Sequence, residues 1–231
     1  MIPLRDNIPS SRTPVVTVGL IAANILVYVS QLMLPPQEAV QFVYLYGLIP
    51  LEISGGDLLV PHPVPLYATV FTSMFVHGGL FHLGGNMLYL WIFGDNVEDR
   101  IGRLKFLVFY LLSGLAAAAA QIWTDPVSKI PMIGASGAIS GVLGAYLFLF
   151  PHARVLTLIP LGFFYRLVEV PALIVLGFWI IVQVLNGVGT LGAHVGGVAW
   201  FAHIGGFVAG LGMVVLLSGD RKRLHWRDRL L

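Results

Sequence analysis

Cysteine is absent from this sequence of 231 residues, and charged residues are scarce. Without a thiol the chain can hold no disulfide framework, no thiolate-bound metal ion and no cysteine nucleophile. Charged residues make up 10% of the chain, whereas about 25% is usual in globular domains. Hydrophobic residues make up 57%. Water cannot solvate that much apolar surface, so the composition indicates an integral membrane protein.

Six apolar stretches approach the roughly 20 residues that a membrane-spanning helix requires. We therefore predict an all-α, polytopic fold in which residues 1–231 form a single membrane-embedded domain with a bundle of six transmembrane helices. The first stretch is longer than the apolar part of a signal peptide and lacks a cleavage site, so we expect a retained helix. The six predicted helices cover residues 14–34, 80–97, 103–123, 132–150, 168–186 and 198–218.

The basic residues are distributed unevenly over the predicted loops. With six spans both termini lie on one side, and this side receives all of the 13 Lys and Arg residues except Lys129. The positive-inside rule therefore predicts a multi-pass protein of the cell membrane with both termini in the cytoplasm. The basic tail from Arg221 to Arg229 is then expected to anchor the last helix beside the membrane, not to bind nucleic acid.

Two predicted external segments differ in composition. Segment 35–79 contains no Lys or Arg, and prolines and large apolar residues recur along it. A loop this long and apolar is expected to lie in the membrane interface. Segment 187–200 is rich in glycine, and we expect it to form a flexible link between the fifth and sixth helices.

Polar side chains are costly inside a bilayer, so those within the predicted spans are functional candidates. Three spans carry them: His82 and Asn86 in the second, Ser136 and Ser140 in the fourth, and His203 in the sixth. His82, Ser136 and His203 lie equally far in sequence from the expected cytoplasmic ends of their helices. At ~1.5 Å per residue this spacing places them at one level, about 24 Å above the inner boundary and near the outer face.

Small residues at helical spacing suggest which of these candidates meet. The fourth span contains Gly134-Ala135-Ser136-Gly137, and the sixth repeats Ala202-xxx-Gly206-xxx-Gly210. Such patterns permit close helix packing, which is sufficient in itself to explain the glycines but also brings Ser136 and His203 together. A neutral histidine beside a serine can activate the hydroxyl as a nucleophile. We therefore predict Ser136 and His203 as catalytic residues.

The same region contains donors for a developing negative charge. If Pro131 and Gly134 keep the chain irregular, a helix begins near Ser136 and directs its unpaired first-turn N–H groups at the reacting centre. His82 and Asn86 lie four residues apart on one helix face, where they suit an oxyanion hole. Taken singly, each is explained as well by interhelical hydrogen bonding. The span that contains His203 carries no acid, so a Ser–His dyad is expected and not a triad.

Other chemistries find less support in the sequence. There is no His-Glu-x-x-His motif, and His62, His77 and His194 lack carboxylate or thiolate partners, so we expect no metal ion and no other cofactor. An aspartyl protease needs two buried aspartates, but Asp95 and Asp99 both fall at the cytoplasmic end of their helix. A solute transporter would spread its polar residues through the depth of the bundle.

Three motifs occur in order along the chain. They are residues 71–79 with His82, Asn86 and Met87, then Gly134-Ala135-Ser136-Gly137, then Ala202-His203-x-x-Gly206-x-x-x-Gly210. Together they closely resemble the rhomboid family of intramembrane serine proteases, in the six-helix form of its prokaryotic members. The resemblance implies Ser136 as nucleophile, His203 as general base, and His82 and Asn86 as oxyanion-hole side chains. It also implies a serine endopeptidase that cuts other membrane proteins in or near their transmembrane segments.

Some features depart from the family pattern or leave a second interpretation open. The Trp-Arg pair in the first loop of part of the family is missing, and Ser140 replaces an aromatic residue that stacks on the histidine in some members. Ser140 is one candidate hydrogen-bond partner for the His203 imidazole. Glu98 and Arg100 match a family feature, and we expect them to hold the cytoplasmic loop. The alternative function is that of a catalytically inactive relative that binds membrane segments, although such relatives typically lack the serine or the histidine.

Overall fold

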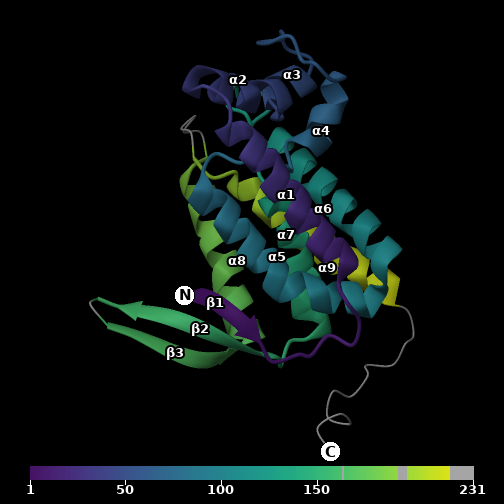
Figure 1. Ribbon diagram of the computed structural model, residues 1–231, viewed down its shortest axis with the longest axis vertical. Coiled ribbons are helices and arrows are strands. Elements are labelled where there is room, and N and C mark those ends of the chain that lie inside the picture. Colours follow the sequence, from purple (N-terminus) through teal and green to yellow (C-terminus); the bar gives the residue numbers. More distant parts are fainter. Residues whose placement is uncertain (163, 192–196, 219–231) are drawn as a thin grey trace, which may run out of the picture.

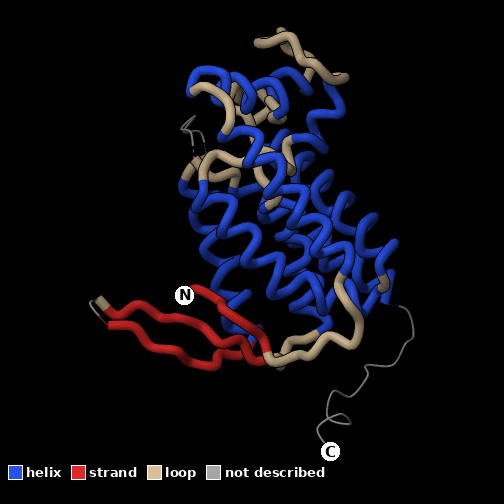
Figure 2. The backbone as a smooth tube through the Cα atoms, viewed as in Figure 1, coloured by secondary structure: helices blue, strands red, loops and turns tan. Residues whose placement is uncertain are grey.

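The computed structural model describes residues 1–162, 164–191 and 197–218, and most of them are helical (Figure 1). The basic tail and His194 lie outside the described residues. Short helices gather at one end of the bundle, and three strands lie at the other (Figure 2). The long helices are α1 (Val15–Leu32), α5 (Leu80–Ile101), α6 (Arg103–Thr124), α7 (Ser136–Leu149), α8 (Ala172–Gly189) and α9 (Trp200–Ser218).

Each of the six predicted helices has a counterpart among these elements, but two begin later than expected. α7 begins at Ser136 and not at residue 132, because Gly134 has a φ of 107°, which is incompatible with a regular helix. α8 begins at Ala172 and not at residue 168, because residues 168–171 belong to a strand.

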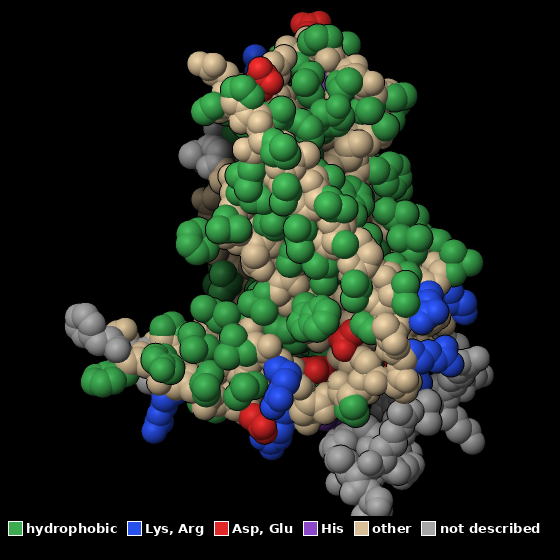
Figure 3. Space-filling view, viewed as in Figure 1, with side chains coloured by type: hydrophobic (Ala, Val, Ile, Leu, Met, Phe, Trp, Pro, Cys, Tyr) green, Lys and Arg blue, Asp and Glu red, His purple; other side chains and the backbone are tan. Residues whose placement is uncertain are grey.

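Among the described residues, four helices are long and apolar enough to cross a membrane: α1, α6, α8 and α9. α5 has the length, but polar residues such as His82, Asn86 and Asp95 make it less apolar. α7 has only 14 residues, fewer than the roughly 20 that usually span a bilayer. The surface agrees with a membrane setting, since hydrophobic side chains cover the visible side of the bundle and most of the basic ones lie at the end that carries the sheet (Figure 3).

Segment 35–79, expected as a loop, is partly helical. Its centre is firmly attached to the bundle, because Leu48 and Met132 exchange two backbone hydrogen bonds, and Leu48 and Ile49 are fully buried. The buried carboxylate of Glu52 accepts hydrogen bonds from the Leu59 backbone and from His62, so the expectation that His62 lacks a carboxylate partner is wrong. Its elements are α2 (Pro36–Tyr46), α3 (Pro50–Ile53), the 3-10 helix η1 (Leu66–Ala68) and α4 (Thr69–Thr72).

The prediction of an all-α fold is wrong at the end of the bundle that lies opposite segment 35–79. There, β1 (Ile2–Asp6), β2 (Arg154–Leu161) and β3 (Phe164–Pro171) form an antiparallel sheet in the order β1-β2-β3. The hairpin of β2 and β3 projects sideways from the bundle (Figures 1 and 2). Residues 168–171 at the end of β3 continue directly into α8, so the predicted fifth span, which starts at residue 168, includes them.

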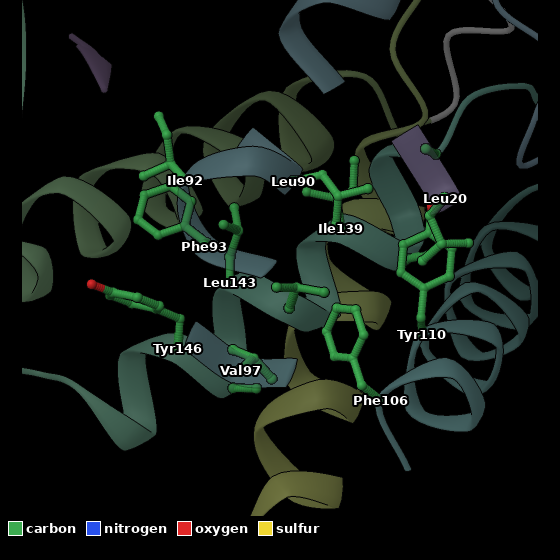
Figure 4. Packing of buried hydrophobic residues seen from close by; sticks show 14 of the residues in the cluster. Leu20, Leu90, Ile92, Phe93, Val97, Phe106, Tyr110, Ile139, Leu143 and Tyr146 are labelled. Carbon is green, nitrogen blue, oxygen red and sulfur yellow. The ribbon is translucent and has the colours of Figure 1, made fainter. Parts of the chain in front are cut away.

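The hydrophobic core lies where α5, α6 and α7 meet (Figure 4). The rings of Phe93 and Tyr146 pack edge to face with their centroids 4.9 Å apart. α7 and α9 approach so closely that a Cβ atom at Gly206 would overlap the carbonyl oxygen of Gly137, and one at Gly210 that of Gly141. The predicted close packing of these two helices is therefore confirmed, and it fixes the relative position of their first turns.

Candidate active site

Ser136 and His203 meet where α7 and α9 begin. Ser136 is the first residue of α7, and His203 lies in the first turn of α9. The Oγ atom of Ser136 lies 2.8 Å from the Nε2 atom of His203, which is a hydrogen-bonding distance. His203 is 9% exposed, so its imidazole is shielded on most sides. The structure thus brings together the two residues that the sequence predicted as a catalytic pair.

The irregular chain before Ser136 brings the start of α7 to the other candidates. The Gly134 N–H donates to the carbonyl oxygen of Ser73, which holds this segment against the chain that follows α4. A Cβ atom at Gly134 would lie 2.6 Å from the Nε2 atom of His82, too close for any other residue. No side chain caps α7, and the first N–H groups of a helix have no partner within it.

The first turn of α9 is held from α6. The side-chain oxygen of Gln121 accepts a hydrogen bond of 3.3 Å from the Ala202 N–H. Behind this contact, a Cβ atom at Gly205 would overlap that of Ala120, so α6 and α9 also pack closely. These contacts orient the turn that carries His203.

The side chain of Asn86 is oriented by a chain of hydrogen bonds. The Nδ1 atom of His77 lies 3.2 Å from the Phe75 carbonyl, which can only accept, so Nδ1 carries the proton. The Nε2 atom of His77 is then an acceptor, and it lies 3.0 Å from the Asn86 amide nitrogen. The backbone N–H and carbonyl groups of His77 are both hydrogen-bonded to the side-chain amide of Gln31, which fixes the position of His77. The Asn86 amide group is therefore a donor with a set orientation.

His82 presents a second donor beside Asn86, close to Gly134. Its Nδ1 atom accepts from the Gly78 N–H at 3.4 Å, which leaves the proton on Nε2, the atom nearest to Gly134. His82, Asn86, Ser136 and His203 all line one cavity of about 690 Å³. All four predicted site residues are thus gathered around a single space.

The proposed contact between Ser140 and His203 is wrong. The Ser140 hydroxyl donates to the Ser136 carbonyl at 2.6 Å, within α7. The partner of the imidazole is Gln183 of α8, whose Oε1 atom lies 2.8 Å from His203 Nδ1. The Trp179 ring lies alongside, with its centroid 5.8 Å from that of the imidazole.

Sequence reasoning missed Gln183 although a signal was present. Gln183 is a polar side chain within an apolar span, the same criterion that selected the other candidates. The equal depth that singles out His82, Ser136 and His203 is shared by helices predicted to run from the outer to the inner face, whereas Gln183 lies on a helix predicted to run the other way.

The carboxylates of α5 do not belong to this site. Glu98 accepts hydrogen bonds from the Val16 and Thr17 N–H groups and from the Thr17 hydroxyl, so it caps α1 instead of holding the loop after α5. Asp95 and Asp99 bind Ser10 and Ser11 near the sheet. Among the described residues, no group of three or more His, Cys, Asp or Glu side chains could hold a metal ion.

The fold and the site together define a helical membrane protein with a serine–histidine pair at one end of its bundle. A family model described as the rhomboid domain matches residues 66–220, well over half of the chain. The chain therefore belongs to the rhomboid family, as the three motifs predicted. All four predicted site residues lie within the matched region.

Relatives from several organisms share this region. Rhomboid protease GluP of Bacillus subtilis is 35% identical over 128 residues, which cover 55% of this chain and 24% of that protein. Rhomboid protease AarA of Providencia stuartii is 29% identical over 146 residues, covering 56% and 48%. Mitochondrial rhomboid protein 1 of Saccharomyces cerevisiae is 38% identical over 92 residues, covering 38% and 27%. The chain thus matches between about a quarter and a half of the length of these relatives.

Proposed function

We propose that this protein is an intramembrane serine endopeptidase that uses a Ser136–His203 dyad to hydrolyse peptide bonds of other membrane proteins. The observation that carries the proposal is the 2.8 Å contact between Ser136 Oγ and His203 Nε2 at the uncapped start of α7. A serine beside a histidine base is the arrangement that activates a hydroxyl for attack on a carbonyl. The names of the relatives GluP and AarA, both rhomboid proteases, support the same chemistry.

The first half of the reaction forms an acyl-enzyme. The Ser136 oxygen attacks the carbonyl carbon while its proton moves to His203 Nε2. The carbonyl oxygen becomes an oxyanion, and the donors around it are the first N–H groups of α7, His82 Nε2–H and the Asn86 amide. His203 then donates this proton to the nitrogen of the departing amine, and the C–N bond breaks.

The second half restores the enzyme. A water molecule loses a proton to His203 and attacks the acyl carbon, and the ester bond to Ser136 breaks as the serine recovers its proton. The water needs a path to the cavity. α7 is about 21 Å long at ~1.5 Å per residue. In a hydrocarbon core of about 30 Å this places Ser136 several Å below the outer surface, within reach of water.

We propose that α5 and α7 cross the membrane together with α1, α6, α8 and α9. Their polar faces are turned inward, since Asn86 and Ser140 are buried within the bundle. The unequal distribution of Lys and Arg favours cytoplasmic termini in a protein of the cell membrane, with the cavity near the external face.

The substrates in this proposal are transmembrane segments that unwind near their outer end. A spanning helix satisfies its own backbone hydrogen bonds, so a protease must open it before cleavage. Residues of α5, such as Asn86, and Trp179 of α8 line the cavity, and we expect the segment to enter between these helices. Gly or Pro in the substrate lowers the cost of opening the helix, by about 1 or 3 kcal/mol relative to Ala in soluble helices. The narrow approach beside Gly134 favours a small residue before the cleaved bond.

The test is cleavage of a purified single-pass substrate by the wild-type protein and by Ser136→Ala. A matched control is Ser30→Ala, which removes an exposed hydroxyl from α1. We expect product with the wild type and the control and none with Ser136→Ala. Cleavage that survives Ser136→Ala contradicts the mechanism. Tight binding of the substrate without any cleavage by the wild type supports the inactive, segment-binding alternative.

A further inference from the structure

The buried amide of Gln183 contacts the ring nitrogen of His203 that points away from Ser136. Gln183 is 6% exposed and lies in a helix that otherwise consists mainly of large apolar residues. Its Oε1 atom lies 2.8 Å from His203 Nδ1, while His203 Nε2 lies 2.8 Å from Ser136 Oγ. Both ring nitrogens of the imidazole are therefore engaged, one by α8 and the other by α7.

The orientation of the Gln183 amide follows from its second contact. Its Nε2 group donates to the Trp179 carbonyl oxygen at 3.2 Å, one turn earlier in α8. A carbonyl oxygen cannot donate, so the NH₂ group must face Trp179 and the amide oxygen must face His203. The amide oxygen likewise can only accept, and the proton of the neutral imidazole therefore lies on Nδ1.

This proton placement is the one that a general base needs. With the proton on Nδ1, the Nε2 atom carries a free lone pair directed at the Ser136 hydroxyl. The opposite tautomer would place an N–H group against the serine and leave the Gln183 oxygen without a donor. A buried acceptor without a partner costs about 1–3 kcal/mol, so the contact strongly favours the active tautomer.

We propose that Gln183 is a positioning residue that holds the His203 imidazole in the Nδ1–H tautomer and in line with Ser136. The proposal rests on the proposed function and extends the dyad by an uncharged third member. When Nε2 takes the serine proton, Nδ1–H continues to donate to the amide oxygen, and no proton passes to Gln183. An amide also avoids the cost of a buried carboxylate in the membrane interior, several kcal/mol for an unpaired charge.

A purely structural role for Gln183 makes different predictions. An amide that only links α8 to α9 would affect stability, and its loss would leave the chemical step and its pH dependence unchanged. The test therefore compares Gln183→Leu, which removes the acceptor, with Gln183→Glu, which replaces it by a carboxylate. Asn186→Leu is the matched control, because Asn186 is an exposed amide of α8 that binds only its own helix at Val182.

For Gln183→Leu we expect kcat to fall by about 10- to 100-fold, by analogy with the loss of a partner that orients a metal-binding histidine. KM and the thermal midpoint should stay close to those of Asn186→Leu. For Gln183→Glu we expect retained cleavage, with the acid limb of the kcat–pH profile moved to higher pH, because a carboxylate stabilises the imidazolium. Wild-type kcat in Gln183→Leu, or an unmoved profile in Gln183→Glu, would overturn the proposal.

A measurement on the resting protein separates this proposal from the proposed function. Nitrogen NMR of histidine-labelled protein reports which ring nitrogen carries the proton, and His203→Ala identifies the signal. We expect Nδ1–H in the wild type and in Asn186→Leu, and a mixture of tautomers in Gln183→Leu. A protein that cleaves nothing but shows this pattern refutes the proteolytic function and leaves the tautomer assignment standing. Nε2–H in the wild type refutes the role of Gln183 whatever the activity.

Discussion

The cavity around Ser136 and the end of the bundle near the sheet use polar side chains in opposite ways. At the end where α7 begins, Ser136, His203, Asn86 and Gln183 are uncharged groups that hydrogen-bond to one another or to neighbouring histidines. At the end near the sheet, the carboxylates of Asp95, Glu98 and Asp99 accept hydrogen bonds, and their partners are backbone N–H groups and hydroxyls of the first 17 residues.

The carboxylates near the sheet hold the first residues of the chain against the helices. Glu98 is 2% exposed and accepts three hydrogen bonds at the N-terminus of α1, where the helix dipole also favours a negative charge. The Asp6 carboxylate of β1 accepts a hydrogen bond of 2.5 Å from the Tyr146 hydroxyl of α7. These contacts tie the start of the chain to the helices.

Under the proposed mechanism, the difference between the two regions separates permanent charge from transient charge. The Glu98 carboxylate holds the N-terminus of α1 whether or not a reaction is in progress. A proteolytic centre instead creates an imidazolium and an oxyanion only during the reaction, and neutral donors and acceptors stabilise these charges without burying any in the resting state. Substitutions at the first end should therefore change rates, and those at the second end should change stability.

The largest expected effect is that of His203→Ala. Loss of the base should lower kcat by about 10⁴-fold or more, as for other serine–histidine pairs that act as a unit. His152→Ala, which changes an exposed histidine at the opposite end of α7, is the control. The comparison of the two ends fails if both variants cleave a model substrate equally well.

Asn86→Ala should have the next largest effect. The amide stabilises charge that exists only in the transition state, and loss of one such donor typically lowers kcat by ~10²–10³. Steady-state kinetics should show the change in kcat, with KM little altered. A change confined to KM would instead identify Asn86 as a residue that positions the substrate.

At the opposite end, Glu98→Gln should act on stability alone. The amide places a donor where the carboxylate accepted, so at least one N–H group of α1 loses its partner, at a cost of about 1–3 kcal/mol. Unfolding in detergent should occur at lower temperature, while kcat per folded molecule stays unchanged. Glu169→Gln, on the exposed hairpin, is the matched control. A lower kcat at unchanged stability would remove the distinction between the two ends.

The smallest expected effect is a pH dependence of stability from Asp6. Burial raises the pKa of Asp6 from 3.8 to about 6, despite the hydrogen bond from Tyr146, which lowers it. Between these values the folded protein holds a proton that the unfolded chain has lost. The stabilising contribution is therefore complete below about pH 4 and is lost as the pH rises to about 6. Asp6→Asn should remove this component from thermal unfolding curves, and Asp57→Asn, at an exposed site, should not.

Much of this arrangement could be predicted from the sequence, because membrane constraints act locally. The scarcity of charge and the apolar runs indicate the helices, and the equal depth of His82, Ser136 and His203 indicates the site. The helix start near Ser136 was expected only if Pro131 and Gly134 keep the chain irregular, and the predicted span itself began at residue 132. Each of these inferences uses residues that lie within a single helix or its flanking loop.

The features that escaped prediction depend on contacts between distant segments. The sheet forms only because β1 pairs with β2, with Asp6 opposite Val155, although the two strands lie far apart in the sequence. The five residues of β1 contain no local pattern that predicts this pairing. Gln183 is assigned a role only when α8 and α9 are placed side by side. The cap of α1 by Glu98 likewise joins residues more than 80 positions apart.

The most direct test of the central claim is covalent labelling of the resting protein by a fluorophosphonate probe. Such a probe reacts with a serine that a neighbouring base has activated, so it requires no knowledge of the substrate. Mass spectrometry should locate the probe on Ser136 in the wild type and in His152→Ala, and should find no label in His203→Ala. Equal labelling of Ser136 without His203, or labelling of another serine in its place, would contradict the account.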